Sequence, residues 1–226
     1  MLDLLRNMRN GTFLEIGGND GWKTTNTYHL EQCLGWQGIM IEGHPQNFQR
    51  MLRARPGVLS LGIAACKEHG VVAFTNRSGV ASGINDLMSS HHKKRFHIVT
   101  KDSMLVPCGP LGDWLAALHA HSIDYFSLDV EGAEMLVLET LDWSALTVGV
   151  LLVECTSSGL EGCISERDRA IGSYLSKRGL TRLGAFRARH DIWDLVFVNR
   201  TRMGELAEDW NQLPWHRSNT TAVGAL

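Results

Sequence analysis

The sequence lacks the features of a membrane-spanning, secreted or strongly charged protein. No apolar run is long enough to cross a bilayer, and residues 1–6 lack the apolar core of a signal peptide. The 22 lysines and arginines nearly balance the 24 aspartates and glutamates, so the formal net charge is -2. This balance gives no general attraction for nucleic acid or for an anionic membrane surface. We therefore expect a protein that binds neither.

The cysteines also lack a recognisable arrangement. None of the five forms a C-x-x-C pair, which argues against a zinc knuckle or a redox dithiol. An odd number without a framework predicts reduced thiols and a cytoplasmic location. Because the first expected strand starts as early as residue 12, the sequence is compatible with being a piece of a longer protein. In that case the expected location loses its basis.

Length and composition predict one α/β domain. The chain has 226 residues, of which 44% are hydrophobic, and this is enough for a sizeable single core. We expect the domain to span residues 1–226, with its core at about 11–200 and an irregular tail at 201–226.

A glycine-dense stretch, residues 13–21, follows the first apolar run. Its glycines read G-G-x-x-G, so the G-x-G-x-x-G fingerprint of dinucleotide binding is missing. We expect a strand at 12–16, a tight turn, and a helix over 23–34 whose N-terminus faces a ligand. Glu15 followed by Gly-x-Asn-x-Gly suits a ligand that carries an amino group beside a carboxylate, such as the methionine end of S-adenosylmethionine. A purely structural turn is the alternative interpretation.

A second short apolar run, residues 38–41, ends in Glu42. This acid lies 27 positions after Glu15, close to where nucleotide-binding βαβ units place the acid that accepts hydrogen bonds from ribose. The alternative is a solvent-exposed glutamate at a strand end. In the next expected strand, 58–65, Ala64 and Ala65 are small enough for an adenine ring to pack on them, although small core residues explain them nearly as well.

The middle of the chain contains a cluster of acids at the end of another apolar run. Asp129, Glu131 and Glu134 lie within six residues after the strand that begins at 123, and such proximity is costly unless water, a cation or a substrate compensates. The nearly continuous apolar run 147–153 ends in Glu154 and is typical of a central parallel strand. The cluster is therefore a candidate site.

The remaining patterns complete a doubly wound sheet. We expect a long polar connection of functional or mobile character at 76–100, in which the histidines and lysines of 91–97 form a hydrated loop. The other expected elements are an extra hairpin strand at 70–75, helices at 46–53, 111–121, 133–140 and 167–178, and a terminal strand pair at 180–186 and 192–198. Ligands bind such sheets outside the carboxyl ends of the strands. Glu15, Glu42, Asp129 and Glu154 should therefore meet at one edge.

Three stretches, residues 13–21, 40–45 and above all 123–134, resemble the FkbM-type methyltransferases, a branch of the class I S-adenosylmethionine-dependent enzymes. The likeness runs from about residue 11 to 200, and 106–108 and 111–115 also fit. It implies a mostly parallel, seven-stranded, Rossmann-like sheet with a terminal antiparallel strand pair. Glu15 stands where the family usually has aspartate, and Asn19 agrees with this branch.

The resemblance implies a methyl donor, S-adenosylmethionine, which leaves S-adenosylhomocysteine, and a small-molecule or sugar-like acceptor. The hypothesis is methylation of a hydroxyl group, with Asp129, Glu131 and His190 as catalytic residues. The expected cofactor-binding residues are Glu15, Gly17, Gly18, Asn19, Asp20, Gly21, Glu42, Gly43, Ala64, Ala65 and Asp129.

Several alternatives stay open. His190 with Asp191 beside it is a candidate base only if the last strand pair brings it to the same edge. A variant adds a divalent cation such as Mg²⁺, held by Asp129 and Glu154 with Glu131 as a further ligand, although no metal residues are assigned. A non-catalytic binding module that retains the fold is the main rival function. A nicotinamide-dependent reductase fits the fold but not the glycine spacing.

Overall fold

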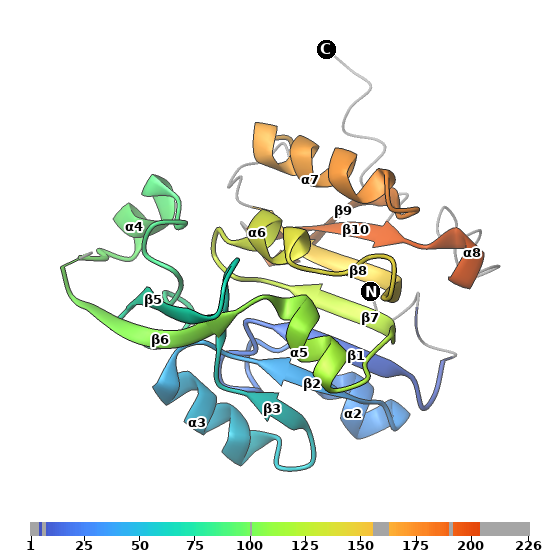
Figure 1. Cartoon of the computed structure of the whole chain (residues 1–226), viewed down its shortest axis with the longest axis horizontal. Coiled ribbons are helices and arrows are strands. Elements are labelled where there is room, and N and C mark those ends of the chain that lie inside the picture. Colours follow the sequence, from blue (N-terminus) through green and yellow to red (C-terminus); the bar gives the residue numbers. More distant parts are fainter. Residues whose placement is uncertain (1–4, 6–7, 100, 156–162, 190–191, 204–226) are drawn as a thin grey trace.

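The computed structural model describes residues 5, 8–99, 101–155, 163–189 and 192–203. Its main feature is a seven-stranded sheet in the order β3-β2-β1-β7-β8-β10-β9 (Figure 1). The strands are β1 Thr12–Ile16, β2 Gln37–Ile41, β3 Leu59–Leu61, β7 Ser122–Leu128, β8 Thr147–Glu154, β9 Thr181–Arg189 and β10 Ile192–Val198. The expected doubly wound α/β architecture is confirmed.

Strand direction follows the expected pattern as well. The pairs β2–β3, β1–β2, β1–β7 and β7–β8 are parallel. β10 runs antiparallel to both β8 and β9, which confirms the terminal strand pair. The apolar run of β8 lies between two neighbours and is buried from Val148 to Val153, so both of its faces are covered. Acids that follow the parallel strands therefore share one edge.

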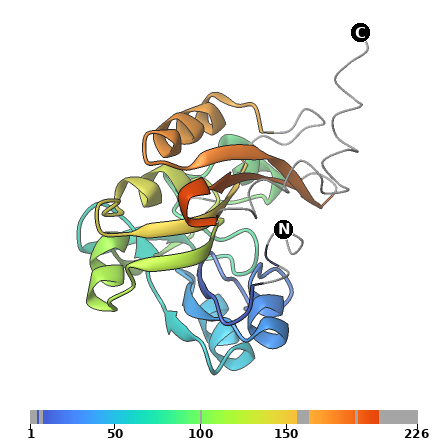
Figure 2. The same cartoon turned by 90° about the vertical axis from the view of Figure 1, so that its right-hand side faces the viewer.

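Helices cover the two faces of the sheet. Helices α5 (Leu111–Ala117), α6 (Glu134–Glu139) and α7 (Glu166–Ser176) contribute to the apolar cluster on one face. Helices α2 (Tyr28–Leu34), α3 (Pro45–Ala54) and α8 (Arg200–Met203) contribute to the cluster on the other face. Figures 1 and 2 show α7 lying along the β9–β10 end and α2 and α3 at the opposite end. The core is thus built in two apolar layers, one on each side of the sheet.

The helix expected over 23–34 is shorter than predicted. Helix α2 begins at Tyr28, and residues 21–27 form bends and turns instead. The reason is that Thr25, Asn26 and Thr27 donate hydrogen bonds to Glu15, which holds this segment off a helical path. The prediction that a helix N-terminus faces the glycine turn is therefore wrong.

A second, smaller sheet was not foreseen. The expected strand 58–65 divides into β3 in the main sheet and β4 (Ala64–Ala65), which pairs with β6 (Ser103–Gly109). β5 (Gly70–Thr75) pairs antiparallel with the other side of β6. The long connection contains helix α4 (Ser90–Arg95), which lies with β5 and β6 at one side of the molecule (Figure 1). Pairing to β6 is what separates β4 from β3.

The cysteines are not all reduced, contrary to the expectation. Cys66 and Cys108 form a disulfide, as do Cys155 and Cys163, and only Cys33 is free. The pairing of β4 with β6 brings Cys66 next to Cys108 across 42 positions of sequence, which spacing alone cannot reveal. Structural disulfides are typical of oxidising compartments, so the cytoplasmic location loses the support of its cysteine argument and stays a prediction.

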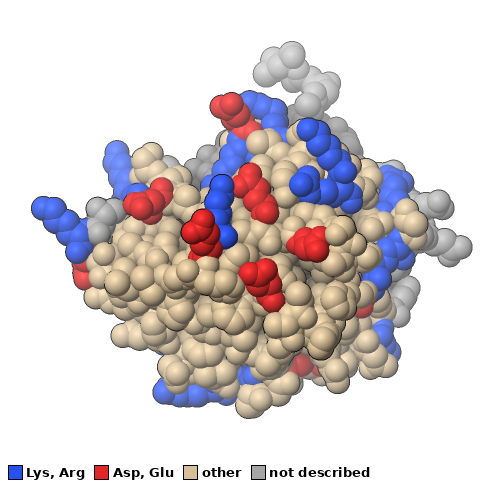
Figure 3. All heavy atoms as spheres, in the orientation of Figure 1, with Lys and Arg blue, Asp and Glu red and all other residues tan. Residues whose placement is uncertain are grey.

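The surface and the helices add two observations. In the described part of the chain, no helix has both the length and the apolar character needed to cross a membrane. On the face seen in Figure 3, acidic and basic side chains are interspersed, and they do not form separate acidic and basic patches.

The disulfide between Cys66 and Cys108 is expected to stabilise the folded protein. Replacing both cysteines with serine should lower the free energy of unfolding by about 3–4 kcal/mol, because the link closes a long loop in the unfolded chain. Denaturant unfolding without reductant measures this change. Cys33→Ser is the control, since this exposed thiol is unpaired. Peptide mapping that finds free thiols at 66 and 108 in non-reduced protein would contradict the pairing.

Candidate functional site

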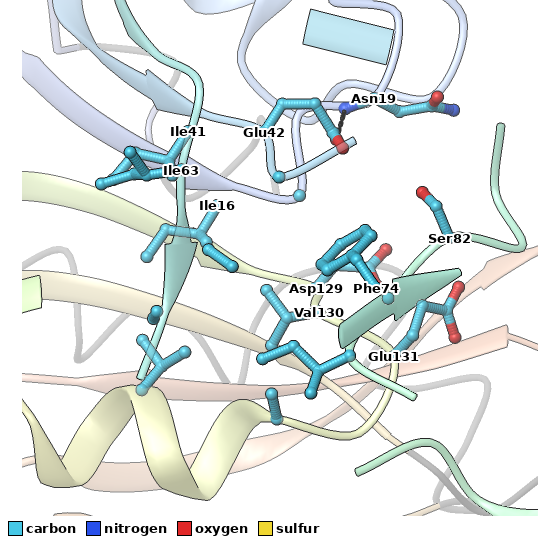
Figure 4. A pocket seen from close by; sticks show the side chains of 18 of the residues that line it. Ile16, Asn19, Ile41, Glu42, Ile63, Phe74, Ser82, Asp129, Val130 and Glu131 are labelled. Atoms are coloured by element: carbon cyan, nitrogen blue, oxygen red, sulfur yellow. Dashed lines mark hydrogen bonds between the residues drawn. The ribbon is translucent and has the colours of Figure 1, made fainter. Parts of the chain in front are cut away.

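The carboxyl ends of β1, β2 and β7 border a cavity of about 690 Å³ (Figure 4). The segment 79–84, which belongs to the long connection after β5, supplies another wall. Of the predicted site residues, the cavity lining includes Gly17, Asn19, Glu42, Gly43, Ala64, Ala65, Asp129 and Glu131. Its position outside the carboxyl ends of parallel strands is where sheets of this kind bind ligands. The predicted meeting of acids at one sheet edge is confirmed for Glu42 and Asp129.

Gly17 sits where β1 and β7 end side by side. Its φ is +85°, and an added Cβ would lie 1.7 Å from the carbonyl oxygen of Asp129. The backbone N–H of Asp129 in turn donates to Ile16, and that of Gly17 donates to Ile41. Only glycine can occupy this position without moving the backbone. Its contact with Asp129 sets the distance between the two halves of the cavity edge.

Glu42 is held by the glycine turn and by the start of α3. Its carboxylate accepts the backbone N–H of Asn19 at 2.9 Å and that of His44 at 2.7 Å. Because the side chain is only 4% exposed, burial raises the pKa of Glu42 to about 7, against these two hydrogen bonds. Asn19 has a left-handed φ of 47°, and its buried Oδ1 has no hydrogen-bond partner. The edge thus carries a carboxylate and, buried beside it, an acceptor without a hydrogen-bond partner.

Glu15 is buried but does not line the cavity. Its carboxylate accepts the hydroxyl of Thr25 at 2.6 Å, the hydroxyl of Thr27, and the N–H of Asn26 at 2.7 Å. Burial raises the pKa of Glu15, and these donors and the guanidinium of Arg55 oppose that shift. In the structure Glu15 orders the loop after the glycine turn. Its contact with a cofactor stays a prediction.

Three more predicted residues support the turn from outside the lining. Gly18 allows Met40 and Met51 to pack against the backbone, since a Cβ there would meet both side chains at less than 3 Å. Gly21 adopts a φ of +71°, and the carboxylate of Asp20 accepts the N–H groups of residues 22 and 23. These residues shape the turn, and direct binding by them stays a prediction.

The small sheet forms the apolar part of the cavity. Ala64 and Ala65 of β4 line it together with Phe74 of β5. An added Cβ on Gly43 would lie 2.9 Å from the ring of Phe74, so the glycine lets the aromatic side chain approach β2. Phe74 was missed in the sequence because the pairing of β5 with β6 was not foreseen.

The acids after β7 and β8 form the most acidic part of the site. Oxygen atoms of Asp129, Glu131 and Glu154 lie within 4.8 Å of one another. Burial raises the pKa of Asp129 and of Glu154 well above their usual values, and the charge of Glu131 adds to both shifts. A hydrogen bond between the two side chains opposes the shift in the pKa of Asp129 and adds to that of Glu154, so Glu154 is the acid that holds the proton between them. Glu131 adopts a left-handed φ of 53°, which is uncommon for a side chain of this kind. Residues held in such conformations concentrate at functional sites.

His92, which the sequence analysis assigned to a hydrated loop, lies near these acids. Helix α4 carries its imidazole Nδ1 to 2.7 Å from a carboxylate oxygen of Glu131, and its Nε2 is buried without a partner. The hydroxyl of Ser89 accepts the N–H of His92 and starts the helix. The hydrated loop expected over 91–97 is therefore incorrect for His92. The predicted catalytic residue His190 lies outside the described residues.

Comparison with solved structures agrees with this geometry. The chain resembles the methyltransferase FkbM from Methylobacillus flagellatus KT with 15% identity and a TM-score of 0.51, covering 83% of this chain and 43% of that one. It resembles Aeropyrum pernix fibrillarin, solved with bound S-adenosyl-L-methionine, with 14% identity and a TM-score of 0.50, covering 84% and 67%. At these identities the likeness shows the fold, which is that of the class I methyltransferases.

The sequence itself gives the family. A family model described as the methyltransferase FkbM domain matches residues 15–180. The chain therefore belongs to the FkbM methyltransferase family, as the glycine turn and the acids after β7 indicated. No curated protein matches the sequence.

Gly17→Ala tests the contact on which the cavity edge depends. We expect it to lower the free energy of unfolding by about 3 kcal/mol or more, because the new Cβ collides with the backbone of Asp129 at a positive φ. The control Gly172→Ala lies in α7 with open space around it and should be neutral or stabilising by about 0.4–1 kcal/mol. Equal stability of the two variants in denaturant unfolding would refute the contact.

Proposed function

We propose that the protein transfers a methyl group from S-adenosylmethionine to a hydroxyl group of a small or sugar-like acceptor. The observation that carries this proposal is the arrangement around one cavity: Glu42 at the end of β2, Asn19 on the glycine turn, and Asp129 at the end of β7. Membership of the FkbM methyltransferase family supports the class of reaction.

The residues present fit this cofactor. Glu42 keeps lone pairs that can accept hydrogen bonds from two ribose hydroxyls, since each of its oxygens accepts only one backbone N–H. The unpartnered Oδ1 of Asn19 offers an acceptor for an ammonium group. Ala64 and Ala65 leave a flat apolar surface that suits an adenine ring. The cavity therefore offers a complementary group for the base, the ribose and the amino acid end.

The role of the protein in the reaction is mainly to orient. When bound, S-adenosylmethionine supplies an electrophilic methyl group on a sulfonium, and transfer is an in-line displacement that depends on close approach and alignment. Asp129 and Glu131 line the same cavity and offer oxygen acceptors to the hydrogen of an acceptor hydroxyl. The hydroxyl of Ser82, from the wall formed by 79–84, donates to Gly79 and accepts from Asn47, which leaves one lone pair as an acceptor for a polyhydroxylated molecule (Figure 4).

The direct test is transfer of radiolabelled methyl from S-adenosylmethionine to a panel of simple glycosides and other small alcohols. We expect a labelled ether product that resists the alkaline treatment that cleaves methyl esters. Asp129→Asn should reduce the rate by at least about a hundredfold if this residue contacts the reacting hydroxyl. Labelled amine products, or the absence of S-adenosylhomocysteine binding in calorimetry, would argue against the proposal, and the second result would favour the non-catalytic module.

The raised pKa of Glu42 makes the binding of S-adenosylhomocysteine depend on pH. An ionised carboxylate accepts ribose hydrogen bonds more strongly than a protonated one, so binding favours the ionised form. Because the folded pKa is about 7, affinity should be about tenfold weaker at pH 6 than at pH 8. Glu42→Gln should bind more weakly at pH 8 and lose most of this difference. Calorimetry that gives both proteins the same pH dependence would exclude Glu42 from the ribose site.

A further inference from the structure

The acids beside the cavity have the spacing of ligands around one cation. Asp129 and Glu131 follow β7, Glu154 ends β8, and one oxygen of each lies within 4.8 Å of the others. Two oxygens bound to the same Mg²⁺ or Ca²⁺ lie at most about 4–5 Å apart. Acids gathered at a surface often have no ion between them, so the spacing alone does not define a site.

Asp194 supplies a second, independent observation. It lies directly opposite Glu154 in the antiparallel pairing of β10 with β8, so both side chains point to the same face of the sheet. The residue is only 6% exposed, and burial without any opposing hydrogen bond raises the pKa of its carboxyl to about 7. The strand pairing therefore places Asp194 beside Glu154, at the same end of the sheet as the other acids. An unpartnered buried carboxylate next to other acids is costly without a cation.

Protein cations in the described part of the chain leave this charge largely uncompensated. Arg167 pairs with Glu134 and Arg202 with Asp124, so neither of these arginines forms an ion pair with the three acids or with Asp194. Among the described side chains, His92 alone forms an ion pair with one of the three acids, through Glu131 at 2.7 Å. An imidazole that holds a carboxylate in this way is a common outer partner of a metal ligand.

We propose that Asp129, Glu131 and Glu154 bind one divalent cation beside the cavity, and that Asp194 lies next to them as a further source of negative charge. Ligands that are all carboxylate oxygens favour a hard cation of the Mg²⁺, Mn²⁺ or Ca²⁺ type. A role for this ion in orienting the acceptor hydroxyl rests on the proposed function. Binding of the ion does not, since it requires neither methyl donor nor acceptor.

The experiment titrates the purified, metal-free full chain with Mn²⁺ alone and follows free Mn²⁺ by electron paramagnetic resonance. We expect one site in the wild-type protein and at least about tenfold weaker binding in Glu154→Gln and in Asp194→Asn. The matched control is Glu139→Gln, which removes a half-exposed carboxylate that pairs with Lys67 outside the cluster. This control should bind Mn²⁺ like the wild type.

Thermal unfolding of the same proteins provides a second measurement. Mn²⁺ or Mg²⁺ should raise the melting temperature of the wild type and of Glu139→Gln but not that of Glu154→Gln. Without metal, Glu154→Gln should be at least as stable as the wild type, because it removes a repulsive buried charge, so loss of binding cannot be attributed to unfolding.

Equal affinity of wild type and Glu154→Gln for Mn²⁺ would overturn the site. Wild-type affinity in Asp194→Asn together with weak binding in Glu154→Gln would overturn the part assigned to Asp194. Failure of the metal site is distinguishable from failure of the proposed function. Binding of S-adenosylhomocysteine without any binding of Mn²⁺ would overturn the metal site alone. Binding of Mn²⁺ without any binding of S-adenosylhomocysteine would overturn the proposed function alone.

Discussion

The structure of the site depends on the close approach of two parallel strand ends, where Gly17 meets the backbone of Asp129. The absence of a side chain at Gly17 lets the carbonyl of Asp129 occupy the space that a Cβ would fill. Backbone hydrogen bonds from Asp129 to Ile16 and from Gly17 to Ile41 then join the exits of β1, β2 and β7. As a result Glu42 and Asp129, which are far apart in sequence, border one cavity.

Removing acids from water is the main energetic cost of this arrangement, and different interactions offset this cost for different acids. Glu15 is surrounded by donors from residues 25–27, and Glu42 by two backbone N–H groups. Asp129, Glu154 and Asp194 have no comparable set of donors among the described residues, and burial raises the pKa of all three. Hydrogen bonds within the fold satisfy the first two acids, whereas the charge of the last three is offset by protonation or by the proposed cation.

The sequence predicted the features that depend on local pattern. Apolar runs that end in an acid marked the exits of β1, β2, β7 and β8, and parallel connection by helices implied that these exits share one edge. Features that depend on distant pairing were not predictable from one sequence. The partner of β5 and β4 is β6, whose residues 103–109 gave no clear strand signal, and the disulfide of Cys66 follows from that pairing. The ion pair of His92 with Glu131 likewise joins segments 39 positions apart.

The motif Asp129-Val130-Glu131-Gly132-Ala133-Glu134 shows how one short segment gives neighbouring acids different tasks. Glu134 is fully buried, accepts the N–H groups of Val130 and Gly132, and pairs with Arg167, so it locks the turn after β7. Gly132 has a φ of +125° and passes so close to the carbonyl of Leu87 that a Cβ would lie 2.3 Å from it. Because the turn is fixed on both sides, Glu131 is forced into its left-handed conformation toward His92 and the cavity. The third acid of the motif thus holds the first two in place, and this explains why carboxylates that repel one another can remain side by side.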